Sequence, residues 1–482
     1  MVSIGFGHLR YLGTRDPRSR PQTLGFEEVL LGGLADHGGL YVPERVPELD
    51  ASFLRGCALL PYAELAARIM TLFAGEAFSA DALRSLAAAA YREFSHPAVA
   101  PLVQLDKRLW LMELFHGPTL AFKDIALQLL GRLFDAALAR RRRRVTVVGA
   151  TSGDTGSAAI AACREREAID IFILYPHRRI SEVQRRQMTT VEAPNAHAVA
   201  IEGTFDDCQD LVKALFADTA LRQELDLAAV NSINWARIAA QSVYYFAAGL
   251  ALGAPARSLS FSVPTGNFGN VYAGHLARRL GLPVAHLVIG TNRNDSLARY
   301  FATGRMTIAA VEPSLSPSMD IQVPSNFERL LFELKGGSGA AVGAAVAAFR
   351  SSGSLSEDDQ AWRRARDLFS AHRVGDNLTM QTIAETHSST GVLIDPHTAV
   401  AVAAARAELR ETGGEAPIVA LATAHPGKFP DAVERATGVR PAVPEALADL
   451  GARRERIIVL PNDLGAVRDF IRAQARRAEG TA

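Results

Sequence analysis

The sequence predicts an α/β protein built on two parallel-sheet domains, preceded by a mainly helical N-terminal domain. Apolar runs such as 145–149, 169–175 and 284–290 show little alternation, and segments with helical spacing separate them. Strands of this kind are buried on both faces, as in parallel sheets covered by helices. The 482 residues suffice for two or three domains with sizeable cores.

Taken in order, the first 95 residues carry amphipathic helical spacing at 26–31, 60–75 and 80–94, which predicts a separate helical domain. The chain then alternates between strands and helices, and we expect one α/β domain over 96–255 and a second over 256–482. The expected strands cover 109–114, 145–149, 169–175, 196–201, 258–263, 284–290 and 417–423. Helices are expected over 124–138 and 271–280, and from residues 158 and 431.

Composition and charge exclude several classes of protein. The chain is 48% hydrophobic and 21% charged, with a net charge of +1, so no overall field attracts nucleic acid or an anionic membrane. Its basic run, 140–144, fits a solvated helix end, where cations complement the helix dipole. No apolar run is long enough to cross a bilayer, and the start lacks the pattern of a secretory signal. Three scattered cysteines fit reduced thiols, so we expect a cytoplasmic protein.

A lysine at the start of the predicted helix 124–138 is the first candidate for chemistry. A Gly117-Pro118 turn precedes the helix, which places Lys123 near the positive end of the helix dipole. The neutral, nucleophilic amine is easier to reach there, as a Schiff-base lysine requires. Taken alone, however, Lys123 fits an ordinary solvated lysine better, and the case depends on the rest of the chain.

Two strand–glycine turn–helix units could bind anions through backbone amides at a helix start. The turn at 265–270 lacks both the Gly-Lys-Ser/Thr of a nucleotide P-loop and the glycine spacing of a dinucleotide fold. A single phosphate group would fit this turn, but the segment could also be a plain tight turn between strand and helix. The turn at 151–157 could bind a carboxylate or a second phosphate, or could be an N-capping cluster.

A Schiff-base lysine combined with a monophosphate site indicates pyridoxal 5'-phosphate, a cofactor that also needs a partner for its ring nitrogen. Thr423, at the end of a predicted buried strand, could supply that hydroxyl, although it also fits an ordinary strand end. His372, His387, His397 and His425 lack metal-ligand spacing, so no metal is predicted.

Residues 116–124 resemble the pyridoxal-phosphate lysine signature of the threonine synthase family, in the branch with an extra N-terminal domain. Segments 151–156 and 264–270 are similar to that family's substrate loop and phosphate loop. Further segments that resemble the family are 38–43, 231–238, 316–321 and 421–426. Because these matches occur in order from residue 10 to residue 440, the resemblance is specific.

The resemblance implies the tryptophan-synthase-β-like fold, called PLP fold type II, with the cofactor between two α/β domains. Lys123 would form the Schiff base, and Thr423 would meet the pyridine nitrogen. The residues expected to hold the cofactor phosphate are Gly266, Asn267, Phe268, Gly269 and Asn270. The residues expected to bind the substrate's carboxylate or phosphate are Thr151, Ser152, Gly153, Asp154 and Thr155. Arg237 is a further candidate for the substrate phosphate, or else a helix-surface arginine.

Asp154 departs from the wider fold, in which many relatives carry an asparagine that donates to the cofactor's phenolic oxygen. A carboxylate that faces a phenolate would be repelled. We therefore expect Asp154 to be either turned away or protonated.

The activity implied by the resemblance is the conversion of O-phospho-L-homoserine and water to L-threonine and phosphate, by a monomer or homodimer. Lys123 would move protons at Cα and Cβ as general base and acid. One alternative is a related phospho-lyase that releases a keto acid. Another is a non-catalytic protein that binds pyridoxal phosphate or a phosphorylated metabolite, which the intact Lys123 disfavours. A nucleotide-binding kinase is disfavoured by the missing P-loop.

Overall fold

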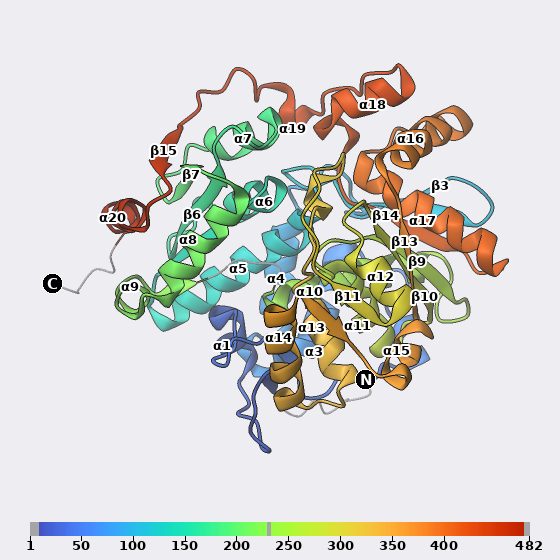
Figure 1. Ribbon diagram of the computed structural model, residues 1–482, viewed down its shortest axis with the longest axis horizontal. Helices are drawn as coiled ribbons and strands as arrows, with labels where there is room; N and C mark the ends of the chain where they lie inside the picture. The colour runs from blue at the N-terminus through green and yellow to red at the C-terminus, as the bar shows by residue number, and fades with distance from the viewer. Residues whose placement is uncertain (1–8, 229–232, 477–482) are drawn as a thin grey trace.

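Two mainly parallel β-sheets form the framework of the computed structural model, which describes residues 9–228 and 233–476 (Figure 1). The larger sheet has the strand order β13-β10-β9-β14-β4-β3, and only the edge strand β3 runs antiparallel to its neighbour. Its strands are β3 (Leu102–Gln104), β4 (Leu109–Glu113), β9 (Leu259–Pro264), β10 (Val284–Thr291), β13 (Phe369–Arg373) and β14 (Ile418–Ala422). The α/β prediction is confirmed.

The smaller sheet is parallel throughout, in the order β15-β7-β6-β5-β8. Its strands are β5 (Val145–Ala150), β6 (Ile169–Pro176), β7 (Ala196–Glu202), β8 (Leu227–Ala228) and β15 (Ile458–Pro461). Every residue of β6 is buried, as its uninterrupted apolar run indicates. The helices α5 (Lys123–Arg141), α6 (Asp154–Cys163) and α8 (Phe205–Ala217) pack around this sheet.

Strand β14 of the larger sheet is apolar at every position because its two faces contact two different helical layers. In β14, Ile418 and Ala420 belong to the core beneath α17 (Pro396–Thr412), whereas Val419 and Leu421 belong to the core of α10 (Trp235–Ala251) and α11 (Gly269–Arg279). Both faces of the strand are therefore covered by helices.

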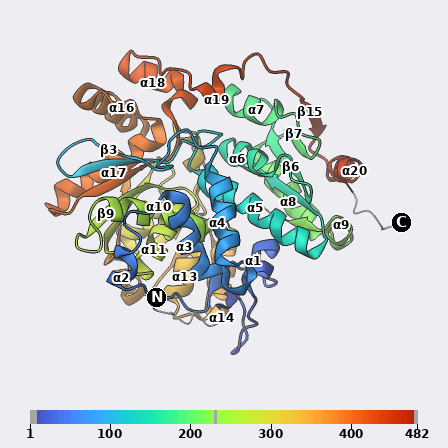
Figure 2. The same ribbon diagram turned by 180° about the vertical axis from the view of Figure 1, so that it is seen from behind.

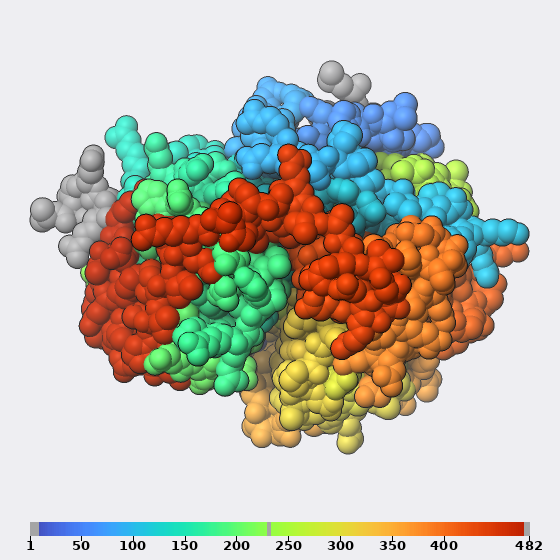
Figure 3. Space-filling model, turned by 90° about the horizontal axis from the view of Figure 1, so that it is seen from above, coloured from blue at the N-terminus to red at the C-terminus, as the bar shows by residue number. Residues whose placement is uncertain are grey.

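The two sheets exchange segments across the boundary expected at residue 255. β4 lies next to β14 in the larger sheet, although it precedes the smaller sheet in sequence. Conversely, β15 pairs with β7, after the C-terminal chain has crossed over the molecule from α18 (Pro430–Thr437), as Figure 3 shows in red. The contiguous ranges 96–255 and 256–482 therefore do not follow sheet membership, because parallel strands pair with partners that local sequence does not indicate.

The N-terminal residues are helical, with α1 (Phe26–Gly32), α3 (Tyr62–Ala74) and α4 (Ala80–Tyr91) beside the antiparallel pair β1 (Tyr11–Gly13) and β2 (Tyr41–Pro43). Figure 2 shows these helices on the back of the molecule, near α10. They share one hydrophobic core with α10, because the ring of Trp235 lies against Tyr11 and Phe73. No helix within residues 9–228 and 233–476 has the length and apolarity that crossing a membrane requires.

The Trp235→Ala substitution should lower the free energy of unfolding by about 3–5 kcal/mol, because it empties this shared core. Trp235 has an exposed fraction of 0%. Leu59→Ala is the control, since Leu59 is 98% exposed and should change stability little. Urea unfolding measures both variants, and equal stability of the two would contradict the shared core.

Candidate active site

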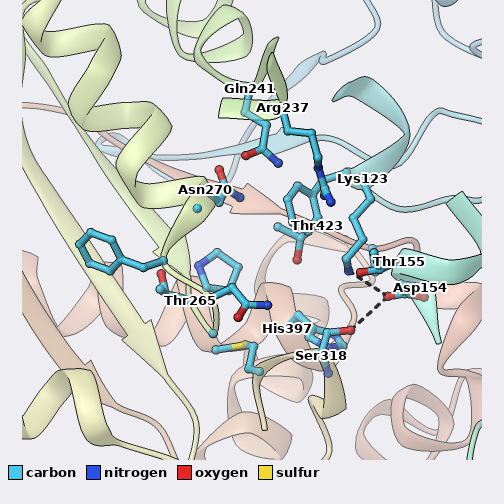
Figure 4. A pocket seen from close by; sticks show the side chains of 18 residues that line it. Lys123, Asp154, Thr155, Arg237, Gln241, Thr265, Asn270, Ser318, His397 and Thr423 are labelled. Carbon is cyan, nitrogen blue, oxygen red and sulfur yellow. Dashed lines mark hydrogen bonds and ion pairs between the residues drawn. The ribbon is translucent and has the colours of Figure 1, made fainter. Parts of the chain in front are cut away.

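A pocket between the two sheets collects side chains from both (Figure 4). Its floor is formed where β9 and β14 end and where α5, α6, α10 and α11 begin. Ligands of open α/β sheets bind at such carboxyl ends of strands. The lining residues are Phe122, Lys123, Asp154, Thr155, Arg237, Gln241, Pro264, Thr265, Gly266, Asn267, Phe268, Gly269, Asn270, Ser318, Met319, His397, Thr423 and Ala424.

The loop before α5 holds Lys123 at the first position of the helix. The carboxylate of Asp124 accepts hydrogen bonds from the amide nitrogen (2.8 Å) and the hydroxyl (2.7 Å) of Thr119, which closes the turn. Gly117 admits no side chain, since a Cβ there would lie 2.4 Å from the Cβ of Asp124. The amide of Phe122 donates to the carbonyl of Thr423 at 2.9 Å and thereby ties the loop to the end of β14.

Lys123 is 9% exposed, and its Nζ lies 3.8 Å from Oδ2 of Asp154 and 4.9 Å from the ring centre of Phe122. Burial is the main cause that lowers the pKa of Lys123, from 10.5 to about 8, and the cations Lys428 and Arg237 act in the same direction. Asp154 opposes this shift. A useful fraction of the amine is therefore neutral near pH 7, as a nucleophilic lysine requires.

The turn between β9 and α11 forms one wall of the pocket. Phe268 adopts the left-handed conformation (φ 64°), and a Cβ on Gly266 would lie 3.0 Å from Cδ1 of Ile321. The Tyr244 and Tyr245 hydroxyls donate to Oδ1 of Asn270 at 2.5 and 3.0 Å. Its buried Nδ2 finds no acceptor among the described residues. That donor and the first amides of α11 therefore remain available to a phosphate group.

Arg237 lies in the first turn of α10 and is only 3% exposed, which excludes the helix-surface alternative. Burial lowers the pKa of Arg237 to about 10, so the guanidinium stays charged at neutral pH. Its Nε and Nη1 are buried without a hydrogen-bond partner in the part of the chain that the structure describes. The guanidinium therefore has two donors free for an anion in the pocket.

The 151–157 turn contributes two of its residues to the pocket, Asp154 and Thr155. Thr151 instead stabilises the turn itself, because its Oγ1 accepts from the amides of Gly153 (3.0 Å) and Gly156 (2.9 Å). Ser152 is exposed. Roles of Thr151, Ser152 and Gly153 in substrate binding therefore stay predictions.

Asp154 is neither turned away nor protonated, contrary to expectation. It lines the pocket, and its Oδ1 lies 2.7 Å from Nζ of Lys428. Burial alone would raise the pKa of Asp154, but the ammonium groups of Lys428 and Lys123 outweigh it and hold the pKa well below its usual range. The sequence did not indicate this second lysine, which approaches from the turn after β14.

Sequence reasoning also missed the pocket roles of Gln241, Ser318 and His397. Nδ1 of His397 lies 2.7 Å from Asp395, and its Nε2 accepts from the amide of Ser318 at 3.3 Å. His397 was considered only as a metal ligand, whereas Asp395-Pro396 is a recognisable helix start that could have placed it. Of the family segment 231–238, residues 231 and 232 lie outside the described residues.

Metal binding stays a negative prediction. Among the described residues, the group with metal-ligand spacing is His372, Glu408 and Glu411, which is not part of the pocket.

Three family models match the chain. "Threonine synthase N terminus" matches residues 10–91, "Pyridoxal-phosphate dependent enzyme" matches 95–424, and "Threonine synthase, C-terminal" matches 398–471. The chain belongs to the threonine synthase family. The threonine synthase of Pseudomonas aeruginosa is 55% identical to this chain, and the alignment covers 98% of this chain and 100% of the relative. The threonine synthase of Saccharomyces cerevisiae is 39% identical, and the alignment covers 93% of this chain and 94% of the relative.

Solved threonine synthase structures share the fold. The crystal structure of PLP-bound threonine synthase from Brucella melitensis has a TM-score of 0.93 at 48% identity, covering 97% of this chain and 100% of that one. The yeast enzyme has a TM-score of 0.91 at 38% identity, covering 96% and 98%. Fold type II and pyridoxal phosphate, both implied by the resemblance, are therefore confirmed for this threonine synthase family member.

Proposed function

We propose that this enzyme converts O-phospho-L-homoserine and water to L-threonine and inorganic phosphate. The observation that carries the proposal is the arrangement of two separate sets of anion donors beside one buried lysine. The 266–270 turn forms one set, and Arg237 forms the other. A phosphorylated cofactor and a phosphorylated amino acid together supply two such anions.

The residues present fit pyridoxal phosphate. Lys123 would hold it covalently, the buried Nδ2 of Asn270 and the amides that start α11 would bind its phosphate, and the hydroxyl of Thr423 would meet its ring nitrogen. When bound, the cofactor withdraws electrons from Cα of the substrate and so makes its protons removable. A neutral hydroxyl at the ring nitrogen supports a less fully protonated ring than a carboxylate would.

The chain's own residues then supply proton transfer and charge stabilisation. The neutral amine of Lys123 takes one proton from Cα and then one from Cβ, and it returns protons to Cγ, which becomes the methyl carbon, and to Cα. Phosphate leaves from Cγ, and the guanidinium of Arg237 neutralises its charge as the C–O bond breaks. One water adds its hydroxyl at Cβ, so that substrate and water together equal threonine and phosphate.

The test is to incubate the holoenzyme with O-phospho-L-homoserine and to quantify threonine, phosphate and keto acid together. We expect threonine and phosphate in equal amounts. Phosphate with an equal amount of keto acid and no threonine would favour the phospho-lyase alternative. If none of the three products forms, the result would favour the alternative of a non-catalytic binding protein. A cytoplasmic location and a monomeric or homodimeric state stay predictions.

Capture of pyridoxal phosphate by the apoprotein should be pH-dependent, because only the neutral form of Lys123 reacts. Its pKa of about 8 means that the neutral fraction rises about tenfold per pH unit below pH 8 and levels off above it. Stopped-flow absorbance of the bound cofactor measures this rate. A rate that levels off only above pH 10, as for an exposed lysine of pKa 10.5, would contradict the burial argument.

A further inference from the structure

Lys428 is a lysine without solvent access, which requires an explanation. It ends the short turn Pro426–Lys428 after β14, and its side chain is 0% exposed. Its Nζ lies 2.7 Å from Oδ1 of Asp154 and donates to the carbonyl of Thr119 at 2.8 Å. Burying an ammonium group is costly unless an anion and hydrogen-bond acceptors surround it. Asp154 is that anion, and it lines the pocket.

Asp154 lies between two lysines and presents one oxygen to each. Oδ1 is the partner of Lys428, and Oδ2 lies 3.8 Å from Nζ of Lys123 (Figure 4). Neutral donors complete its surroundings, with Nε2 of Gln184 at 3.1 Å from Oδ1 and the hydroxyl of Ser318 at 3.3 Å from Oδ2. The nearer cation, Lys428, therefore interacts more strongly with the carboxylate than Lys123 does.

The charges around Lys123 come from four elements. Asp154 on α6 favours the ammonium form of Lys123. Lys428, in the turn after β14, and Arg237, on α10, oppose it. Asp124 on α5 also favours the ammonium form, but burial raises the pKa of Asp124 itself to about 6. His397 on α17 also faces this group, because its Nε2 accepts from the amide of Ser318, the residue whose hydroxyl donates to Asp154. Without Lys428, Asp154 would pair with Lys123 alone.

We propose that Lys428 is a positioning residue: by neutralising Asp154, it frees Lys123 to lose its proton and permits a carboxylate where many relatives of the wider fold carry asparagine. The Asp154–Lys428 ion pair, which has no net charge, thus stands where those relatives carry one neutral asparagine. This inference rests on the proposed role of Lys123 but is independent of the identity of the substrate.

The experiment measures the pH midpoint of pyridoxal phosphate capture, by absorbance, in four apoproteins. In Lys428→Met the midpoint should rise by about one pH unit, which makes capture at pH 7 about tenfold slower. In Asp154→Asn the midpoint should fall, because two lysines then face each other without an anion. The double variant Asp154→Asn/Lys428→Met should return close to wild type, since its pair again has no net charge.

Opposite shifts that cancel in the double variant are a signature that a merely structural role of Lys428 would not give. Lys335→Met is the matched control, because Lys335 forms a 2.8 Å ion pair with Glu357 elsewhere and should leave the midpoint unchanged. Equal midpoints in wild type and Lys428→Met, or shifts of the same sign in both single variants, would overturn the proposal. If Lys428→Met does not fold, a lower midpoint in Asp154→Asn that the double variant reverses supports the proposal, and no reversal overturns it.

A separate variant, Lys123→Ala, tests the proposed role of Lys123. If Lys123→Ala still captures the cofactor with the wild-type spectrum, another residue forms the covalent bond.

Discussion

Lys123→Ala should abolish covalent cofactor binding and reduce threonine formation by roughly 100- to 10,000-fold or more. The physical reason is that Lys123 is both the attachment point and the base, and its Nζ is the buried amine of lowered pKa that lines the pocket. Borohydride reduction of the holoenzyme, followed by peptide mass spectrometry, locates the attachment. We expect the added mass on the peptide that contains Lys123, and on no peptide of the variant.

Lys213→Ala is the control for this substitution, because Lys213 is an exposed lysine whose side chain is 73% accessible. It should retain both the reduced adduct and the activity of the wild type. An adduct on another lysine in the wild-type protein would contradict the assignment of Lys123.

Arg237→Gln should lower kcat/KM for O-phospho-L-homoserine by roughly 10- to 150-fold, the loss of one charge-assisted interaction of about 1.5–3 kcal/mol. Its unfolding free energy should not fall by a comparable amount, because the guanidinium has two buried nitrogens without partners among the described residues. Steady-state kinetics and urea unfolding measure the two quantities.

The spectrum of the bound cofactor separates two roles for Arg237. If Arg237 binds the substrate phosphate, Arg237→Gln keeps the cofactor at wild-type affinity. Loss of the cofactor with no change in kcat/KM of the reloaded enzyme would instead assign Arg237 to the cofactor phosphate. Arg237→Lys should recover part of the lost activity, since it restores the charge but not the two-nitrogen geometry.

Most strands could be predicted from the sequence, because buried parallel strands leave uninterrupted apolar runs. The predicted run at 169–175 became β6, and the run at 284–290 became β10. The short strands β13 and β15 were missed, since β15 is partly exposed and ends in Pro461, and β13 has polar positions. Sheet membership could not be predicted, because β4 and β15 pair with strands far away in the sequence.

The site was predictable where a turn motif precedes a helix. Lys123 and the 266–270 turn each lie at a recognisable strand–turn–helix junction, Arg237 came from the family resemblance, and all of them line one pocket. His397 was not predicted, although the helix start Asp395-Pro396 could have placed it, and Lys428 was not predicted because it acts through a partner that only the fold brings near. Lys428 meets Asp154 across 274 positions of sequence, and no local pattern records that contact.

The most direct test of the central claim is to run the reaction in water enriched in oxygen-18 and to analyse threonine and phosphate by mass spectrometry. We predict one labelled oxygen in the threonine hydroxyl and unlabelled phosphate, because water adds at Cβ after the Cγ–O bond has broken. Unlabelled threonine, or phosphate accompanied by a keto acid in place of threonine, would contradict the proposed reaction.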